Sequence, residues 1–329
     1  MDYHGQIYAT FGAAAAISNS TEFDRDNWTS GYQTTYGRYL LIGWCALTLL
    51  ISLPGNTLIL VASIKYNAIR LDKVAIILIE NIAVADMGVA LFTILPRMAS
   101  AIAAGWEYAC DVSAPVTLLF SGASILMMSA LNLSKLTCLL FPLRARMRTH
   151  TQGRIIAASL WVCIVLLICL LQIVTQILLG KFMGTYYDTH HYCCIIDPQP
   201  KVRLLFADVF ATFIIVPIGT MAVTTIWLMV YVKKVRGISK ESVVTLITIS
   251  LVFFVSFIPI VIGRLFTAQI YLFGHDSYYY FEFVYGVCYL NYIANPFVYF
   301  FTVKSFNGFV VNLFRGGERG APRPSQITA

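Results

Sequence analysis

A carboxylate inside an apolar segment is the side chain of this sequence best placed to do chemistry. Asp86 follows Ala83-Val84-Ala85 in a long hydrophobic run. A carboxylate deep in hydrocarbon is expensive, so it should face the interior of a helical bundle and have a polar partner or a bound cation there. The run therefore predicts a buried polar site.

Hydroxyl side chains recur along a second apolar run, at Ser113, Thr117, Ser121 and Ser124. Spacings of three and four residues place them on one face of a helix. Two interpretations stay open. The stripe could line the interior of a bundle, or each hydroxyl could simply bond to the backbone of its own helix.

A third apolar run carries two amides and a proline, Asn291, Asn295 and Pro296. Proline removes a backbone hydrogen bond and kinks a helix. Amides in hydrocarbon are costly unless they have partners. The run suits a bundle in which the kink faces polar groups, but a proline-kinked helix of a transporter would also fit.

Enzyme chemistry has no comparable support in the sequence. No metal-ligand cluster, nucleophile paired with a base, or phosphate-binding loop is visible, so we expect no enzyme. Of the histidines, only His190 and His191 are adjacent, and they could bind zinc adventitiously. We expect no cofactor for such chemistry.

The elements that must position these residues are membrane-spanning helices. The chain of 329 residues is 58% hydrophobic and 12% charged, whereas soluble domains carry about 25% charged residues. Runs of roughly 20 apolar residues are needed to cross a bilayer. Seven such runs occur, at about 39–64, 74–98, 113–140, 154–179, 204–231, 242–266 and 278–302. The sequence therefore predicts an all-α integral membrane protein with a seven-helix bundle.

The basic residues indicate the orientation of the bundle. With the N-terminus outside, roughly two-thirds of the 23 lysines and arginines lie on the inner side, as the positive-inside rule requires. Glycosylation sequons at Asn19 and Asn27 agree with an extracellular tail. The net charge of +7 then indicates contact with anionic membrane lipid rather than nucleic acid. We expect a multi-pass protein of the plasma membrane.

Four parts follow along the chain. Residues 1–38 are the extracellular tail, 39–302 the transmembrane domain, 303–315 a short amphipathic helix, and 316–329 a cytoplasmic tail. Of eight cysteines, only Cys110, Cys193 and Cys194 face the oxidising side. A disulfide from Cys110 to either Cys193 or Cys194 would hold the loop over the third helix.

Further marks fall one to a helix, in a fixed order, across about residues 39–315. They are Asn56, Ala83-Val84-Ala85-Asp86, Trp106 with Cys110, Pro142-Leu143, Trp161, Pro217, Phe253 with Pro259, and Asn295-Pro296-Phe297-Val298-Tyr299 followed by Phe306. Together these marks resemble the rhodopsin-like (class A) family of G-protein-coupled receptors. Each motif alone is weak, and the combination is specific.

The resemblance implies a signalling mechanism. Asp86, Ser124, Asn291 and Asn295 match the family's interior sodium site. Pro259 matches the kink about which the sixth helix swings outward, opening a groove for a helix of a heterotrimeric G protein. Lys135 and Tyr299 match residues of the coupling switch. An extracellular ligand and the G protein would then be coupled reciprocally.

Three positions depart from the family's pattern. Ser134-Lys135-Leu136 stands in place of Asp-Arg-Tyr, Phe257 replaces a tryptophan, and Thr225 replaces a tyrosine. Lysine keeps the charge of arginine but loses its planar fork. Because Ser134 cannot form an ion pair, Glu80 or Glu241 is the expected partner of Lys135. A non-signalling decoy receptor on the same fold is the alternative function. A transporter is a third reading, but the inverted repeats typical of transporters are not visible.

The sequence mainly indicates which classes of ligand this protein does not bind. Thr117 stands where amine receptors carry Asp, and Tyr289 where opsins carry the retinal lysine. Arg97 and Arg264 could receive a carboxylate, or they could snorkel to the membrane interface with Glu282 neutralising one of them. We expect a peptide terminus or a small acid. The predicted pocket residues are Arg97, Thr117, Ser121, Phe257, Arg264, Tyr285 and Tyr289.

Overall fold

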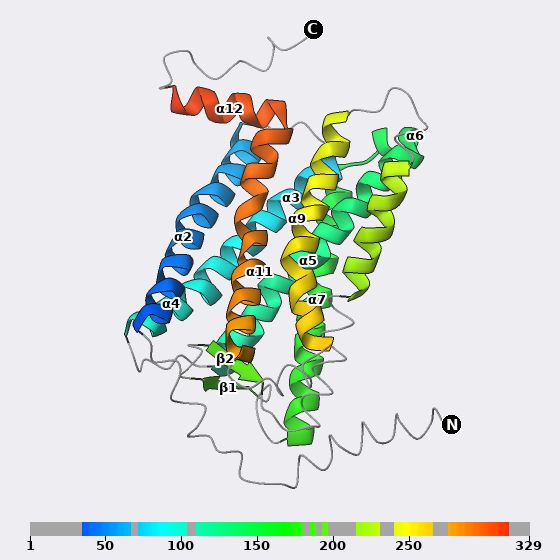
Figure 1. The fold of residues 1–329 in the computed structure, drawn as a ribbon. Helices are drawn as coiled ribbons and strands as arrows, with labels where there is room; N and C mark the ends of the chain where they lie inside the picture. The colour runs from blue at the N-terminus through cyan, green and yellow to red at the C-terminus, as the bar shows by residue number, and fades with distance from the viewer. Residues whose placement is uncertain are drawn as a thin grey trace, which may run out of the picture.

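The computed structural model shows an elongated bundle of long helices (Figure 1). It describes residues 35–66, 72–103, 110–179, 185–188, 193–196, 215–230, 240–265 and 276–315. Each of the seven predicted spans contains a helix within these ranges. Residues 204–214 of the fifth predicted span lie outside them.

The described elements follow one another along the chain in this order. The helices are α2 (Thr35–Leu60), α3 (Lys73–Val89), α4 (Leu95–Ile102), α5 (Cys110–Leu140), α6 (Pro142–Arg146), α7 (His150–Leu179), an unlabelled helix Ile215–Val230, α9 (Lys240–Leu265), α11 (Asp276–Thr302) and α12 (Lys304–Phe314). π-Helical turns, Val61–Lys65 and Ala90–Ile94, extend α2 and join α3 to α4. The strands are β1 (Thr185–Asp188) and β2 (Cys193–Ile196).

The helices have the apolar surfaces of membrane spans. In the described part of the chain, four stretches are long and apolar enough to cross a bilayer unaided: Arg38–Lys65, Lys73–Ile102, Pro115–Cys138 and His150–Val174. Shorter apolar stretches lie at Ile215–Val230 and Ile247–Pro259, and Gly286–Thr302 is long and apolar enough only together with Lys304–Phe314, which follows it after a bend. Exposed side chains such as Leu166 and Ile177 on α7 form a surface suited to hydrocarbon rather than to water.

A proline explains the irregular turn in the second span. Pro96 lies at the start of α4, directly after the π-helical turn Ala90–Ile94. In a regular α-helix its ring would crowd the carbonyl of Phe92, four residues earlier, and it donates no backbone hydrogen bond. The wider π turn relieves this conflict, and the Leu95 amide bonds to the carbonyl of Ala90.

Two ends of the bundle can be distinguished (Figure 1). We call one the α12 end, because α12 lies there with α6, and α11 and α12 meet at a bend of 97°. The other is the hairpin end, where α4 and the strands lie. β1 and β2 pair antiparallel, with Thr185 opposite Ile196, and the pair contacts α5. The hairpin is a small addition that the sequence did not predict.

A glycine allows the closest approach of two helices. A Cβ on Gly55 of α2 would lie 2.6 Å from Cγ of Pro296 on α11. Only a residue without a side chain lets the proline ring pack directly against the α2 backbone. This contact brings the polar residues of α2 and α11 to the same depth in the bundle.

Candidate functional site

The buried carboxylate of Asp86 is the centre of a polar core. Its side chain is fully buried and lies between α5 and α11. Ser124 Oγ donates a hydrogen bond of 2.7 Å to Oδ1, and Asn295 Nδ2 donates one of 2.7 Å to Oδ2. Each carboxylate oxygen therefore has a donor from a different helix, which stabilises the ionised form.

The proline kink of α11 is tied to α2 by an amide. Pro296 cannot donate to the carbonyl of Tyr292, four residues earlier. Asn56 Nδ2 donates to that carbonyl instead, at 3.1 Å, and also to the backbone oxygen of Ser52 at 3.0 Å. Asn56 thus satisfies the oxygen that the proline leaves unbonded.

The second amide of α11 has a different environment. Asn291 is 1% exposed and lies one turn before Asn295. Among the residues that the structure describes, nothing accepts a hydrogen bond from its Nδ2. Of the four residues expected in the sodium site, Asp86, Ser124 and Asn295 are joined by hydrogen bonds, and Asn291 is buried beside them along the helix.

The hydroxyl stripe of α5 faces the interior. Thr117 Oγ1 lies 2.8 Å from Thr93 Oγ1, and the Tyr292 hydroxyl donates to Ser121 Oγ at 3.2 Å. With Ser124 bonded to Asp86, three members of the stripe reach other helices. The alternative that these hydroxyls serve only their own backbone is wrong. The side chain of Ser113 lies outside the described residues.

A buried cation lies near the hairpin end. Arg97 on α4 is 3% exposed, and its Nη1 donates a hydrogen bond of 3.1 Å to the hydroxyl of Tyr289 on α11. The alternative that Arg97 snorkels to the interface is therefore wrong, because its guanidinium is inside the bundle. The side chains of Arg264, Glu282 and Tyr285 lie outside the described residues.

The middle of α9 is aromatic. Phe257 is buried, and its ring lies 4.6 Å from that of Phe253, centroid to centroid. Pro259 lies inside α9, where its missing N–H leaves the carbonyl of Val255 without its usual helical hydrogen bond. Tyr299, on the α12-end side of Pro296, is 1% exposed.

Lys135 lies at the α12 end of α5 and is 8% exposed. Its acidic neighbour is Asp72, which precedes α3 and attracts the ammonium group electrostatically. Glu80, one of the two carboxylates expected to pair with Lys135, accepts a hydrogen bond of 2.6 Å from Ser63 instead. The side chain of Glu241 lies outside the described residues.

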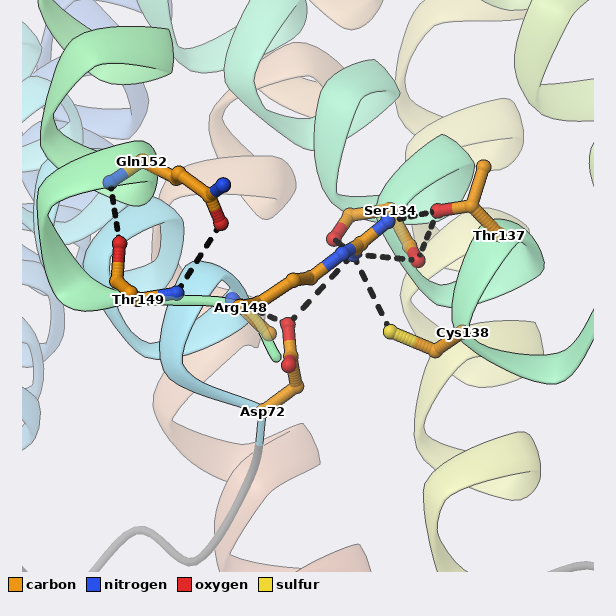
Figure 2. A network of polar contacts seen from close by, with 8 residues as sticks. Asp72, Ser134, Thr137, Cys138, Arg148, Thr149 and Gln152 are labelled. Atoms are coloured by element: carbon orange, nitrogen blue, oxygen red, sulfur yellow. Dashed lines mark hydrogen bonds and ion pairs between the residues drawn. The ribbon is translucent and has the colours of Figure 1, made fainter. Parts of the chain in front are cut away.

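Arg148, in the loop between α6 and α7, connects three segments at this end. Figure 2 shows its guanidinium between Asp72, Ser134, Thr137 and Cys138. Nη1 donates to Ser134 Oγ at 2.8 Å, to the Ser134 carbonyl at 3.2 Å and to Cys138 Sγ at 3.2 Å, while Nη2 donates to Thr137 Oγ1. Nη1 also lies 3.8 Å from Asp72 Oδ2.

Neighbouring residues fix where Arg148 projects from the loop. Thr149 Oγ1 accepts from the Gln152 amide at 3.2 Å, and Gln152 Oε1 accepts from the Thr149 amide at 3.1 Å (Figure 2). This reciprocal cap sets the start of α7. Arg148 was not among the predicted site residues, and its signal in the sequence is the basic run Arg144, Arg146 and Arg148.

Several predicted sites fall outside the described residues. These are the side chains of Cys110, Cys193 and Cys194, and the sequons at Asn19 and Asn27. The described backbone brings β2, which carries Cys193 and Cys194, into contact with α5, which begins at Cys110. The disulfide therefore stays a prediction.

Comparison with known proteins places the chain in a family. It matches the family described as 7 transmembrane receptor (rhodopsin family) over residues 55–299. The chain belongs to this family. It is also similar to neuropeptide FF receptor 2 of Mus musculus, with 21% identity over an alignment of 322 residues; the match covers 86% of this chain and 76% of the mouse protein.

Membership of the rhodopsin family confirms the seven-transmembrane bundle expected from the sequence. The protein is a multi-pass membrane receptor of the G-protein-coupled class, a family of receptors rather than enzymes. The three polar clusters of this receptor then lie at three depths: Arg97 near the hairpin end, Asp86 in the middle, and Lys135 with Arg148 at the α12 end.

Proposed function

We propose that this receptor binds an extracellular ligand bearing a carboxylate and converts that binding into activation of a heterotrimeric G protein. The buried guanidinium of Arg97 carries the proposal. Arginine is permanently charged, and its fork of N–H donors matches a carboxylate. A cation held inside an apolar bundle beside the hydroxyl of Tyr289 is chemistry suited to recognising an anionic group.

A peptide terminus is the favoured source of the carboxylate, with a small acid as the alternative. The similar mouse protein is named as a neuropeptide receptor, which supports a peptide. Thr117 and Ser121 add hydroxyls on the facing surface of α5, and both bond across to neighbouring helices. Phe257 supplies a buried aromatic surface on α9.

The receptor would lie in the plasma membrane. Its hairpin end would face the outside of the cell, and its α12 end would face the cytoplasm. Basic residues of the described chain gather towards the α12 end, at Lys65, Lys73, Arg144, Arg148, Arg154, Lys304 and Arg315. This distribution follows the positive-inside rule. It also suits contact with the anionic lipid of the inner leaflet.

The switch would run through the polar core and α9. Asp86, Ser124, Asn291 and Asn295 provide a buried carboxylate, a hydroxyl and amide oxygens, the ligand types that hard cations such as sodium prefer. A sodium ion would supply the positive charge that neutralises Asp86 in the closed state. Outward movement of α9 about Pro259 would open the α12 end to a helix of the G protein, near Lys135 and Tyr299.

A decoy receptor that binds ligand without signalling is the second candidate. It is favoured by Ser134, which has no carboxylate to pair with Lys135 and instead accepts from Arg148. Basal and ligand-stimulated signalling in cells separate the two candidates, because a decoy binds ligand and activates no G protein.

The ligand proposal is tested with Arg97→Gln and a matched control, Arg38→Gln. Arg38 also lies near the hairpin end, but its guanidinium donates to the backbone oxygens of Ala101 and Ile102. A second-messenger screen of peptides and small acids would first find an agonist. Losing a charge-assisted bond of ~1.5–3 kcal/mol should lower agonist potency by about tenfold to a hundredfold in Arg97→Gln.

A carboxamide analogue of the agonist completes the test. Its potency should be low at the wild-type receptor and insensitive to Arg97→Gln, because the carboxylate it lacks is the group that Arg97 would bind. Equal potency of the acid at wild type and Arg97→Gln, or an equal loss in Arg38→Gln, would contradict the proposal.

A further inference from the structure

Ser250 on α9 accepts hydrogen bonds from two other helices. Asn132 Nδ2 of α5 donates to Ser250 Oγ at 3.1 Å, and Thr225 Oγ1 of the helix Ile215–Val230 donates to the same oxygen at 3.0 Å. Ser250 is fully buried, and both donors are 6% exposed. We call these three residues the Ser250 latch.

The latch lies on the half of α9 that faces the α12 end. Ser250 precedes Pro259 by nine residues, a rise of roughly 13 Å along a helix. One turn further, Thr245 Oγ1 donates to Thr302 Oγ1 of α11 at 2.8 Å. This half of α9 is thus tied to α5, to the helix Ile215–Val230 and to α11.

All these hydrogen bonds join uncharged groups. Between Val244 and Ile262 the α9 sequence contains no charged residue, so this stretch cannot contribute an ion pair. A neutral buried bond shifts an equilibrium only by roughly twofold to tenfold, but breaking it leaves buried donors without an acceptor. If α9 moved away, Asn132 and Thr225 would both lose their acceptor, because they donate to the same oxygen of Ser250.

We propose that Ser250 is a positioning residue that holds α9 against α5 and the helix Ile215–Val230 in the resting receptor, and so sets its basal signalling. The proposal rests on the proposed function for its signalling readout. When the α12-end half of α9 moves away from α5, the oxygen of Ser250 must leave Asn132 or Thr225, or both. A bound G protein has to compensate for that loss.

The first test measures basal nucleotide exchange on a panel of G proteins, normalised to receptor at the cell surface. Ser250→Ala should raise basal exchange about threefold to tenfold. Thr225→Val, which keeps side-chain volume and removes one donor, should raise it less. In the Ser250→Ala background, Thr225→Val should add little, because the shared bond is already absent.

The matched control is Thr248→Ala. Thr248 is a half-buried hydroxyl residue two positions away on α9, outside the latch. It should leave basal exchange unchanged. The proposal would be overturned if Thr248→Ala and Ser250→Ala had equal effects on basal nucleotide exchange. It would also be overturned if Ser250→Ala and Thr225→Val both left basal nucleotide exchange unchanged while agonist signalling stayed normal. A role limited to folding would lower surface expression without raising exchange per receptor.

The second test does not depend on signalling. Hydrogen exchange measured on the purified receptor should accelerate across 240–258 in Ser250→Ala and stay at the wild-type rate in Thr248→Ala. An unchanged rate of hydrogen exchange in Ser250→Ala would overturn the latch. Faster hydrogen exchange in Ser250→Ala, in a receptor that activates no G protein of the panel, would support the latch. It would contradict the proposed G-protein activation instead.

Discussion

The guanidinium of Arg148 lies against Ser134, with Nη1 2.8 Å from the hydroxyl oxygen and 3.2 Å from the backbone carbonyl. In the family pattern that this chain resembles, one helix carries both an acid and the adjacent arginine. Here the acid, Asp72, precedes α3, and the fork-shaped cation comes from the loop before α7. An acid and a guanidinium therefore still meet at the end of α5, but each comes from a different segment outside that helix.

Replacing Arg148 should reveal how much its fork contributes. Arg148→Lys keeps the charge near Asp72 but cannot reach Ser134, Thr137 and Cys138 together. We expect a loss of about 1–2 kcal/mol in the free energy of unfolding, measured by thermal unfolding of purified receptor. Arg144→Lys is the control, because exposed Arg144 lies over the ring of Phe141 and should change stability by less than about 0.5 kcal/mol. Equal stability of the two variants would contradict the role of Arg148.

Reversing the charge at Lys135 should abolish coupling. Lys135→Glu would place a second carboxylate near Asp72 in a buried site, where like charges repel. We expect no G-protein activation, with receptor still detected at the cell surface. Lys73→Glu provides the control, because Lys73 is exposed at the start of α3. Signalling by Lys135→Glu at the wild-type level would show that this cation has no part in coupling.

Sodium should stabilise the receptor through Asp86. Asp86→Asn keeps the shape of the side chain and an oxygen acceptor but removes the negative charge that a cation needs. With sodium at about ten times its Kd, wild type should gain ~1.4 kcal/mol and Asp86→Asn should gain almost nothing. Thermal unfolding in sodium chloride and in N-methylglucamine chloride measures both. An equal sodium response of the two proteins, or none in either, would refute a sodium site here.

The contact between α2 and α11 should tolerate no side chain at Gly55. Gly55→Ala would push a methyl group into Pro296, and overpacking of this kind costs about 1–3 kcal/mol. Gly43→Ala, on the same helix, has nothing within 4 Å of its new Cβ and should be neutral or slightly stabilising. The difference in Tm between the two variants is the measurement. Equal values would show that the helices can separate at Gly55 without cost.

Much of the architecture followed from local properties of the chain. Apolar runs of sufficient length mark the spans, because hydrocarbon excludes unbonded backbone groups. Asp86 and Asn295 could be assigned to the interior for a related reason, since a carboxylate and an amide are both costly in lipid. The hydroxyl spacing of α5 placed Thr117, Ser121 and Ser124 on one face, and the structure shows that face bonded to other helices.

Pairing between distant segments depended on the packing of whole helices. The partners Arg148 with Ser134, Ser250 with Asn132 and Thr225, and Asn56 with the carbonyl of Tyr292 come from different elements. Their contact depends on helix rotation, depth and loop path, which no local pattern encodes. The sequence by itself therefore determined which residues must avoid lipid, because desolvation acts on each side chain. Only the tertiary structure decided which partner each of them found, because a hydrogen bond needs two atoms within about 3 Å.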